Sequence, residues 1–453
     1  MSKRYTPEII SELKDNEIFV FGSNLAGAHG GGAARAAFNK FGAVWGQGVG
    51  LQGQSYAIPT MHGGPEKIKP YVHEFVEFAK NHREYTFLVT KIGCGIAGFA
   101  IEEIAPLFAD AVDVENIILP KEFESVIHGM AGCPTSCSWD SSEDFLVKYT
   151  PLMQSIKDGC IIQYSEIKQL RRKVFQNTVS LVNQGFYHTE TNEKIYFNAP
   201  DSIVSGTAFY SQEMIVDLPE QPSGTTTIVE VVNADCLEEG IRLLEQGYNP
   251  AILNMASRQN PGGGVINGAG AQEETIFRRT SLFKSLYQFA PYAAQYGVKK
   301  SKYQYPMDRN FGGIYSPGIT IFRESEANGY KLMSHPKEMA FISVAGINKP
   351  ELNPEGMIVD TLVETVKNKI RTIFRIGLIH GHDSLVLGAL GCGAFCNPPQ
   401  HIAKLFHEAM NEPEFKNAYK LITFAILEDH NSHKGHNKEG NYMPFKEEFL
   451  QGL

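Results

Sequence analysis

The same pattern of residues occurs twice in this chain, and it limits the folds that the chain can form. Each copy is a Gly-Cys-Gly triplet that follows an apolar run, with an Ile-Ala pair nine residues after its last glycine. The copies are Gly93, Cys94 and Gly95 with Ile104 and Ala105, and Gly391, Cys392 and Gly393 with Ile402 and Ala403. Agreement at equal spacing indicates two diverged copies of one ligand-binding fold.

A second shared feature lies upstream of each triplet. In both halves an apolar run is followed by an asparagine and then by three consecutive glycines. These residues are Asn24, Gly30, Gly31 and Gly32 in the first half, and Asn254, Gly262, Gly263 and Gly264 in the second. The glycine segments support the interpretation as a repeat.

Short apolar runs typical of buried strands alternate with segments typical of helices in both halves. Strands are predicted at residues 18–21, 87–91, 251–254 and 385–387, and helices at 7–13, 66–82 and 358–373, among others. This alternation predicts an α/β fold with mixed sheets covered by helices on both faces, and with ligands at the carboxyl ends of the strands. We expect a first domain at 1–128, a connector at 129–165 and a second domain at 166–453.

Composition excludes several classes of protein. A net charge of −9 argues against a protein that wraps duplex nucleic acid through a broad basic face. The sequence shows neither a membrane-spanning apolar run nor a signal-peptide pattern, so we expect a cytoplasmic protein without membrane contact. The cysteines are sparse and suit reduced thiols. Because Cys133 and Cys137 have no second pair at ligand spacing, we predict no structural metal.

Three consecutive glycines after a buried strand can adopt positive φ, and their backbone amides can converge on a phosphate. A flexible surface turn is the alternative. The chain has no GxxxxGK, which excludes an NTPase P-loop, and the residues after Gly264 do not form a dinucleotide-binding GxGxxG.

Seven residues separate the second glycine segment from Gln272, Glu273 and Glu274, which stand at the start of a predicted helix. Two glutamates in a first turn are commonly surface residues favoured by the helix dipole. Beside a phosphate-holding loop, a carboxyl at a helix start can instead face the anomeric carbon of a sugar.

The segment NPGGGVINGAGAQEE resembles the GGG and QEE signature of the poly(ADP-ribose) glycohydrolases, in its bacterial-type form. The resemblance extends from about Arg171 to near the C-terminus, and it includes ILNMASRQNPGGG and HGHDSLVLGALGCGAF. It implies a macrodomain, which is a three-layer α/β/α unit that holds ADP-ribose in a cleft. It also implies a glycoside hydrolase that cleaves a ribosyl O-glycosidic bond without a metal or a cofactor.

The resemblance assigns roles to individual residues. Glu274 is the implied general acid and base, and Glu273 orients the distal ribose. The diphosphate is expected between the two glycine loops of the second half. The implied substrate-binding residues are Asp235, Asn254, Gly262, Gly263, Gly264, Asn267, Gln272, Gly391, Cys392, Gly393, Ala394 and Phe395.

Several of these residues also have structural interpretations. Asp235 either holds the adenine or caps the helix that follows it, and Phe395 either presses on the ribose or packs in the core. Asn397 is predicted as a helix N-cap. His380 and His382 precede a buried strand, where packing is the favoured role over metal binding.

The chemistry follows from glycoside cleavage, which passes through an oxocarbenium-like state and needs a proton on the leaving oxygen. Glu274 would donate this proton, and its carboxylate would then activate water. Polymer, ADP-ribosylated protein and ADP-ribosylated nucleic acid are the possible substrates. The alternatives are a noncatalytic ADP-ribose reader and a hydrolase of a free ADP-ribosyl nucleotide. The oligomeric state is not predicted.

In the first half, TKIGCGIAG resembles the closing loop of macrodomains related to the terminal ADP-ribose glycohydrolases. Ala97 stands where that family has an acid, and no QEE follows Gly32. We therefore expect a noncatalytic ADP-ribose or nucleotide reader, with residues 50–60 at its rim. Lys91 is interpreted as a strand end rather than a nucleophile.

Overall fold

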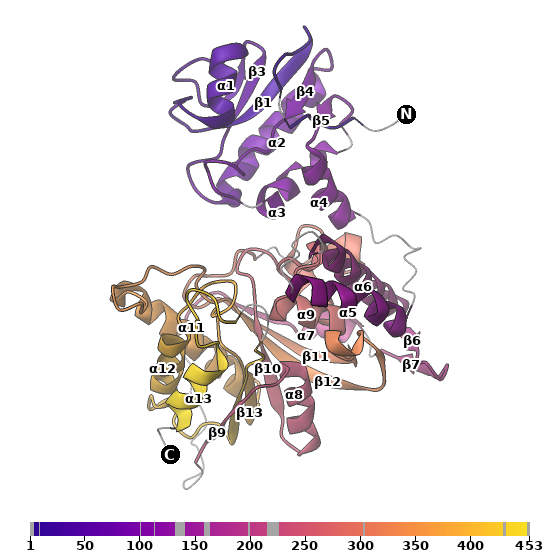
Figure 1. Cartoon of the computed structure of the whole chain (residues 1–453), viewed down its shortest axis with the longest axis vertical. Helices are drawn as coiled ribbons and strands as arrows, with labels where there is room; N and C mark the ends of the chain where they lie inside the picture. The colour runs from indigo at the N-terminus through magenta and orange to yellow at the C-terminus, as the bar shows by residue number, and fades with distance from the viewer. Residues whose placement is uncertain are drawn as a thin grey trace. The chain divides into compact units, whose positions relative to one another are not determined.

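The computed structural model describes residues 4–8, 10–99, 101–112, 114–131, 141–157, 164–197, 200–214, 226–301, 304–428 and 432–450. The chain forms two compact units, Met1–Gly132 and Cys133–Leu453, and each is described by itself (Figure 1).

The first unit is built on one five-stranded sheet. Its elements are β1 (Glu17–Ser23), α1 (Gly32–Lys40), β2 (Gly50–Gln52), β3 (Ser55–Pro59), α2 (Pro65–Asn81), β4 (Thr86–Val89), α3 (Ile101–Ile104), the 3-10 helix η1 (Ala105–Ala111), β5 (Ile117–Ile118) and α4 (Lys121–Ala131). The strand order is β2-β3-β1-β4-β5, and only β2 runs antiparallel to its neighbour.

Alternate residues of β1 belong to two different cores. Ile18 and Val20 pack with residues of α2 and η1, whereas Phe19 and Phe21 pack with Ala34 and other residues of α1. Because successive side chains of a strand point to opposite faces, helices cover both faces of the sheet. The first unit is therefore a three-layer α/β/α structure.

The second unit contains a seven-stranded sheet in the order β8-β11-β12-β10-β13-β14-β9 and a small two-stranded sheet of β6 and β7. Its strands are β6 (Phe186–His188), β7 (Lys194–Tyr196), β8 (Ala208–Tyr210), β9 (Ile228–Val232), β10 (Pro250–Met255), β11 (Gly313–Arg323), β12 (Leu332–Val344), β13 (Ser384–Leu387) and β14 (Leu421–Ala425). Strands β12, β10, β13, β14 and β9 are parallel, while β8 and β11 are antiparallel to their neighbours.

Helices surround this sheet. They are α5 (Ser142–Lys157), α6 (Tyr164–Gln184), α7 (Pro200–Gly206), α8 (Cys236–Glu245), η3 (Val265–Asn267), α9 (Gln272–Arg279), α10 (Leu282–Leu286), η4 (Tyr287–Phe289), η5 (Ala293–Tyr296), η6 (Glu326–Asn328), α11 (Asp360–Ile379), α12 (Pro399–Met410) and α13 (Tyr442–Leu450).

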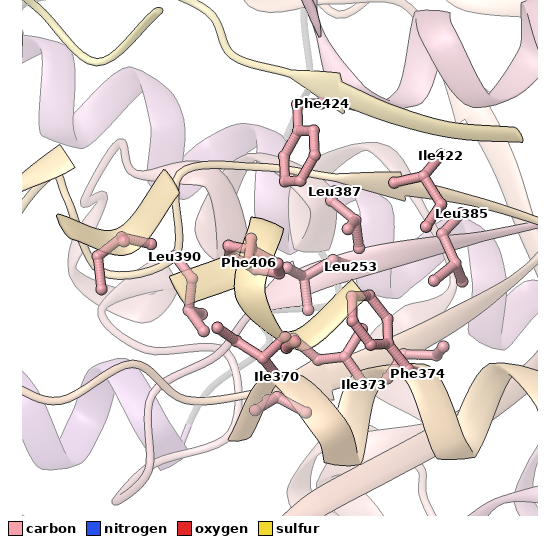
Figure 2. Close-up of a cluster of buried hydrophobic side chains, with 14 of the residues drawn as sticks. Leu253, Ile370, Ile373, Phe374, Leu385, Leu387, Leu390, Phe406, Ile422 and Phe424 are labelled. Carbon is pink, nitrogen blue, oxygen red and sulfur yellow. The ribbon is translucent and has the colours of Figure 1, made fainter. Parts of the chain in front are cut away.

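The two faces of the central strand β10 again belong to different layers. Leu253 packs with Phe374 of α11 and Phe406 of α12 in the core drawn in Figure 2. On the opposite face, Gly240 of α8 lies so close to Ile252 that an added Cβ would be 2.5 Å from its Cδ1 atom. The predicted fold class, α/β units with mixed sheets between helical layers, is confirmed.

The two sheets also share one topology. The order β2-β3-β1-β4-β5 corresponds to β11-β12-β10-β13-β14, with the same single antiparallel pair at the same end. In both, a glycine segment follows the central strand and a Gly-Cys-Gly loop follows the next strand. The second unit adds β8 and β9 at its edges. This agreement supports the interpretation of the chain as a diverged repeat.

One expectation about local structure was wrong. The described part of residues 7–13 is not helical. Thr6, just before it, bonds the carbonyls of Leu119 and Ile118, and Ile10 and Leu13 pack against the core that contains Phe19 and Phe21. The predicted connector at 129–165 includes one helix, α5, which packs on α6 through Phe145 and Val174.

Hydrogen bonds of buried arginines connect the helices of the second unit. Arg171 of α6 donates to both carboxylate oxygens of Glu326, each at 2.7 Å, and it lies directly against Gly270 in the loop before α9. Arg278 of α9 donates to the hydroxyl of Tyr330 at 2.8 Å and to the carbonyl of Ala269 at 2.7 Å. Because these side chains are buried, their partners hold α9 in one position.

We predict that Glu326→Gln lowers the free energy of unfolding of the second unit by about 3–5 kcal/mol at neutral pH, because it leaves Arg171 buried without a carboxylate. Burial alone would raise the pKa of Glu326, but the hydrogen bonds from Arg171 outweigh it and hold the pKa at about 2, below the ordinary 4.5. A lowered pKa stabilises the fold above pH 4.5, and this contribution is lost as the pH falls toward 2.

Urea unfolding at a series of pH values checks this. The difference in the free energy of unfolding between wild type and Glu326→Gln should become smaller below pH 4.5. Glu190→Gln removes an exposed partner of Lys331 and serves as a control that should leave the transition unchanged. An equal effect of both substitutions would contradict the prediction.

Candidate active site

The site lies where β10 ends. The segment after Met255 turns through Gly262 and Gly263, whose φ angles of 78° and 54° are in the left-handed region. A Cβ on Gly262 would lie 2.6 Å from the ring of Phe277, so a larger residue is excluded by packing as well. Glycine is therefore required at this turn.

The backbone amides of this turn bind protein groups. The amide of Gly262 donates to Glu273 at 3.0 Å, that of Gly263 to the carbonyl of Asn260 at 3.0 Å, and that of Gly264 to Glu274 at 2.8 Å. The expectation that these three amides converge on a phosphate is thus not what the structure shows. The turn instead holds two carboxylates.

Glu273 is 4% exposed and accepts three hydrogen bonds, from the amides of Gly262 and Ser257 and, at 3.5 Å, from the side chain of Asn254. Burial, followed by the nearby charge of Glu274, raises the pKa of Glu273 well above its ordinary value, although its hydrogen bonds oppose this. The pair therefore resists carrying two negative charges.

Glu274 is 7% exposed, and only one of its oxygens is bound by the protein. Its Oε1 atom accepts from Gly264, whereas its buried Oε2 atom has no hydrogen-bond partner among the described residues. The same holds for the Oδ1 atom of the fully buried Asn254, whose amide nitrogen donates to Ser343 at 3.0 Å. Two buried acceptors without a partner among the described residues thus belong to neighbours of Glu273.

Gln272 uses its side chain to join α9 to the sheet. Its amide nitrogen donates to the carbonyl of Leu253 at 2.7 Å, and its oxygen accepts from the amide of Met255 at 2.8 Å. Both ends of this side chain are therefore engaged with β10. Gln272 positions the two glutamates that follow it.

The second glycine loop follows β13. Gly391 has a φ of 77°, and a Cβ there would lie 2.5 Å from the side chain of Asn397, which donates to the carbonyls of Gly391, Phe395 and Ile347. Asn397 therefore stabilises the loop rather than capping α12, whose N-cap is Pro398. The helix begins one residue later than predicted.

In the first glycine turn the backbone amides bind protein acceptors, and the middle of the second loop differs in this respect. Within the described residues, the backbone N–H groups of Gly393, Ala394 and Phe395 donate to no protein acceptor. Cys392 is buried, and burial raises the pKa of its thiol, so it is a packing residue. Phe395 is half-buried next to these amides. Successive free amides of this kind form an anion-binding loop.

Asp235 follows β9 and is the N-cap of α8, since one of its oxygens accepts from the amides of Leu237 and Glu238. The same oxygen accepts from the guanidinium of the buried Arg279 at 2.8 Å. The structural role foreseen for Asp235 is thus present. Asn267 is half-buried in η3, and its side chain makes no hydrogen bond within the described residues.

The loops of the first unit repeat part of this arrangement. The amides of Cys94, Gly98 and Phe99 bond the carbonyls of Lys91, Gly95 and Gly93, as those of Cys392, Cys396 and Asn397 bond Ala389, Gly393 and Gly391. The two Gly-Cys-Gly loops therefore have the same backbone conformation.

The first glycine segment of this unit meets that loop. A Cβ on Gly31 would lie 2.9 Å from the side chain of Ile96, and a Cβ on Gly32 would lie 3.4 Å from it. Within the described part of the chain, the amides of Gly30, Gly31 and Gly32 donate to no protein acceptor. Asn24 closes the preceding turn, with both ends of its amide bonded to Ala28.

Lys91 and residues 50–60 were also singled out in the first unit. Lys91 forms ion pairs with Glu122 at 2.7 Å and Glu8 at 3.2 Å, and the Glu122 hydrogen bond raises its pKa, which is unsuitable for a nucleophile. Residues 50–60 include β2 and β3, so most of this expected rim belongs to the sheet.

His380 and His382 lie at the amino end of β13, away from the glycine loops. His380 stacks on Tyr315 at a ring distance of 3.5 Å, and His382 bonds the hydroxyl of Tyr315 at 3.0 Å. The packing role is present. Within the described residues no group of acidic, histidine and cysteine side chains could hold a metal ion. Cys133 and Cys137 lie outside those residues.

Sequence reasoning missed Ser257 and Ser343, which hold Glu273 and Asn254. Ser257 acts through its backbone amide, so no side-chain pattern could reveal it. In the described part of the chain, no helix is long and apolar enough to cross a membrane.

Comparison with known proteins identifies the relatives of this site. Residues 175–324 match the family described as microbial-type PARG, catalytic domain. The second unit is therefore similar to a poly(ADP-ribose) glycohydrolase. The crystal structure of poly(ADP-ribose) glycohydrolase from Thermomonospora curvata is 27% identical with a TM-score of 0.52, covering 62% of this chain and 99% of the other.

Two other solved structures match with lower TM-scores. The Thermomonospora curvata enzyme bound to the inhibitor ADP-HPD has a TM-score of 0.49 at 26% identity, covering 61% of this chain and 98% of the other. The enzyme from Deinococcus radiodurans in complex with ADP-ribose has a TM-score of 0.43 at 26% identity, covering 57% of this chain and 100% of the other. No curated protein matches the sequence.

We predict that Gly263→Ala reduces the release of ADP-ribose from poly(ADP-ribose) by at least about 100-fold, because misplacing a reacting group by about 1 Å has such an effect. The added Cβ would lie 2.4 Å from Oε1 of Glu274 and 3.0 Å from Oε2 of Glu273.

Gly318→Ala is the matched control. Gly318 has a φ of 62°, but an added Cβ there would meet nothing within 4 Å. This substitution should cost about 1 kcal/mol of stability without changing turnover. Normal turnover in Gly263→Ala would show that the turn does not position the acids.

Proposed function

We propose that this protein is a poly(ADP-ribose) glycohydrolase, in which Glu274 is the general acid and base for cleavage of a ribosyl O-glycosidic bond. The observation that carries the proposal is the buried pair of glutamates beside two unpartnered acceptors, Oε2 of Glu274 and Oδ1 of Asn254. A ribose offers hydroxyl donors to such acceptors. The family match at residues 175–324 gives the substrate class.

The diphosphate is assigned to the second glycine loop. The free amides of Gly393, Ala394 and Phe395 supply donors for its oxygens, and the half-buried ring of Phe395 would lie against the distal ribose. The amides of the first glycine turn already bind Glu273 and Glu274. The turn would therefore assist substrate binding only by leaving space for the ribose, since its glycines have no side chains. Asn267 lies at the rim of this turn and would contact the ribose. Asp235 would meet the adenine with the oxygen that does not cap α8.

The proposed reaction uses only side chains of this chain and water. Glu274 donates a proton to the leaving oxygen as the bond from that oxygen to the anomeric carbon breaks. The diphosphate and the remaining carboxylate stabilise the oxocarbenium-like state. Water then attacks the anomeric carbon and returns its proton to Glu274. The raised pKa of Glu273 keeps the total charge of the pair low, which favours retention of a proton at the site.

Glu274→Gln should keep ADP-ribose affinity within a few-fold and lose most release of ADP-ribose, by roughly 100-fold or more, because the amide cannot donate an acidic proton. Incubation with mono- and poly-ADP-ribosylated targets, with the products identified by mass spectrometry, measures this. It also separates a polymer hydrolase from a reader and from a hydrolase of a free nucleotide.

Glu143→Gln is the matched control, because Glu143 also lies in the first turn of a helix, α5, but is exposed. Its turnover should equal that of the wild type. Near-normal turnover in Glu274→Gln would refute the assignment.

For the first unit, we propose an ADP-ribose reader. The free amides of Gly30, Gly31 and Gly32 face the loop that carries Ile96, at the carboxyl ends of the parallel strands β1 and β4. The site has no counterpart of the two glutamates, which favours binding without hydrolysis.

This reader can be tested on residues 1–132, which have their own hydrophobic cores. Isothermal titration with ADP-ribose should show saturable heat, and Gly31→Val should abolish it by filling the space before Ile96. Absence of heat at millimolar ligand would leave this unit with a scaffold role only.

A further inference from the structure

Lys369 is an unusual cation in the second unit. It lies on α11 and the residue is 3% exposed, and within the described residues no hydrogen bond contributes to the pKa of its ammonium. Other buried cations there have partners: Arg171 binds Glu326, and the ammonium of Lys284 donates to the carbonyl of Gly297 at 2.8 Å. A buried charge without a partner is unfavourable, which points to an anion that arrives from outside.

The charged neighbours of Lys369 are mostly cations. Burial, then the charge of Arg258, lowers its pKa to about 8, and Arg309 adds to this while Asp308 opposes it. The Oδ1 atom of Asp308 already accepts from the amides of Asn310 and Phe311, each at 2.8 Å. The two arginines thus add positive charge near Lys369, and the carboxylate of Asp308 is already engaged by backbone amides.

The cluster adjoins the candidate active site. Arg258 is next to Ser257, whose amide holds Glu273. The amide of Met307 bonds the carbonyl of Arg258, and the guanidinium of Arg258 bonds the carbonyl of Met307, both at 3.0 Å. These bonds tie the loop before β11 to the segment that carries the catalytic turn. Arg309 is exposed at the outer side of this loop.

We propose that Lys369, Arg258 and Arg309 form a second anion site, which binds the diphosphate of the ADP-ribose unit next to the one being released. This proposal rests on the proposed function and deepens it, since only a substrate with a repeated diphosphate fills both this site and the second glycine loop. Guanidinium and ammonium groups are the usual partners of phosphate oxygens.

A low-dielectric position makes this site selective. Because Lys369 is buried, a phosphate that reaches it interacts more strongly than it would with a surface lysine. Arg309, at the exposed edge of the site, would be the first of the three cations to contact the ADP-ribose polymer. The cluster also explains how a protein with a net charge of −9 would hold a polyanion locally.

The test compares ligands with one and with several diphosphates. In a Glu274→Gln background, which prevents turnover, affinities are measured by titration for free ADP-ribose and for a short ADP-ribose oligomer. Lys369→Met should weaken oligomer binding about tenfold, with less than twofold change for ADP-ribose. Arg309→Gln, at an exposed position that cannot affect folding strongly, should weaken oligomer binding severalfold and reduce its dependence on salt.

Lys367→Met is the matched control on the same helix, because Lys367 is paired with Glu408 at 2.7 Å. It should bind both ligands as the parent does. Equal affinity of the parent for oligomer and monomer would overturn the proposal, as would an equal loss for both ligands in Lys369→Met.

Because the readout is binding, its outcome is independent of whether Glu274 performs catalysis.

Discussion

The second unit depends on hydrogen bonds from one glycine turn to two neighbouring carboxylates. Two buried carboxylates repel one another and lose their hydration, so they persist only where fixed donors hold them. The amides of Gly262 and Gly264 are such donors. They can approach because the turn runs through positive φ and carries no Cβ atoms toward the acids. The turn and the acids therefore require one another, which explains their fixed spacing along the chain.

The arrangement works only if the start of α9 cannot move, and the surrounding contacts secure it. Gln272 fixes the helix to β10, and Arg278 fixes the loop before it through Ala269. Arg171 is buried against Gly270, and its positive charge is neutralised by the ion pair with Glu326. Positive charge thus enters the interior as paired arginines around the acids, whereas within the described residues Lys369 has no partner of this kind. This contrast is the basis of the second anion site proposed for Lys369.

The fold could be predicted because buried strands and their glycine turns leave local patterns. The strands at 18–21 and 251–254 and the pair Glu273 and Glu274 were all visible in the sequence. The donors to those acids were not, because backbone amides such as that of Ser257 have no sequence signature. The protein acceptors that the amides of Gly262, Gly263 and Gly264 meet were not predictable for the same reason: which acceptor an amide meets depends on tertiary contacts.

Comparison of the two units shows which loop is the same in both and which glycine segment differs. Both units keep a Gly-Cys-Gly loop with the same three backbone hydrogen bonds, so this loop is independent of the acids. The first glycine segment has diverged. In the first unit it leads directly into α1 and its amides are free, while in the second unit the chain inserts η3 and α9, and the acids take up the amides. A glycine turn whose amides hold carboxylates has fewer donors left for a phosphate. In the proposed function, the diphosphate is therefore assigned to the other loop, whose backbone hydrogen bonds are the same in both units.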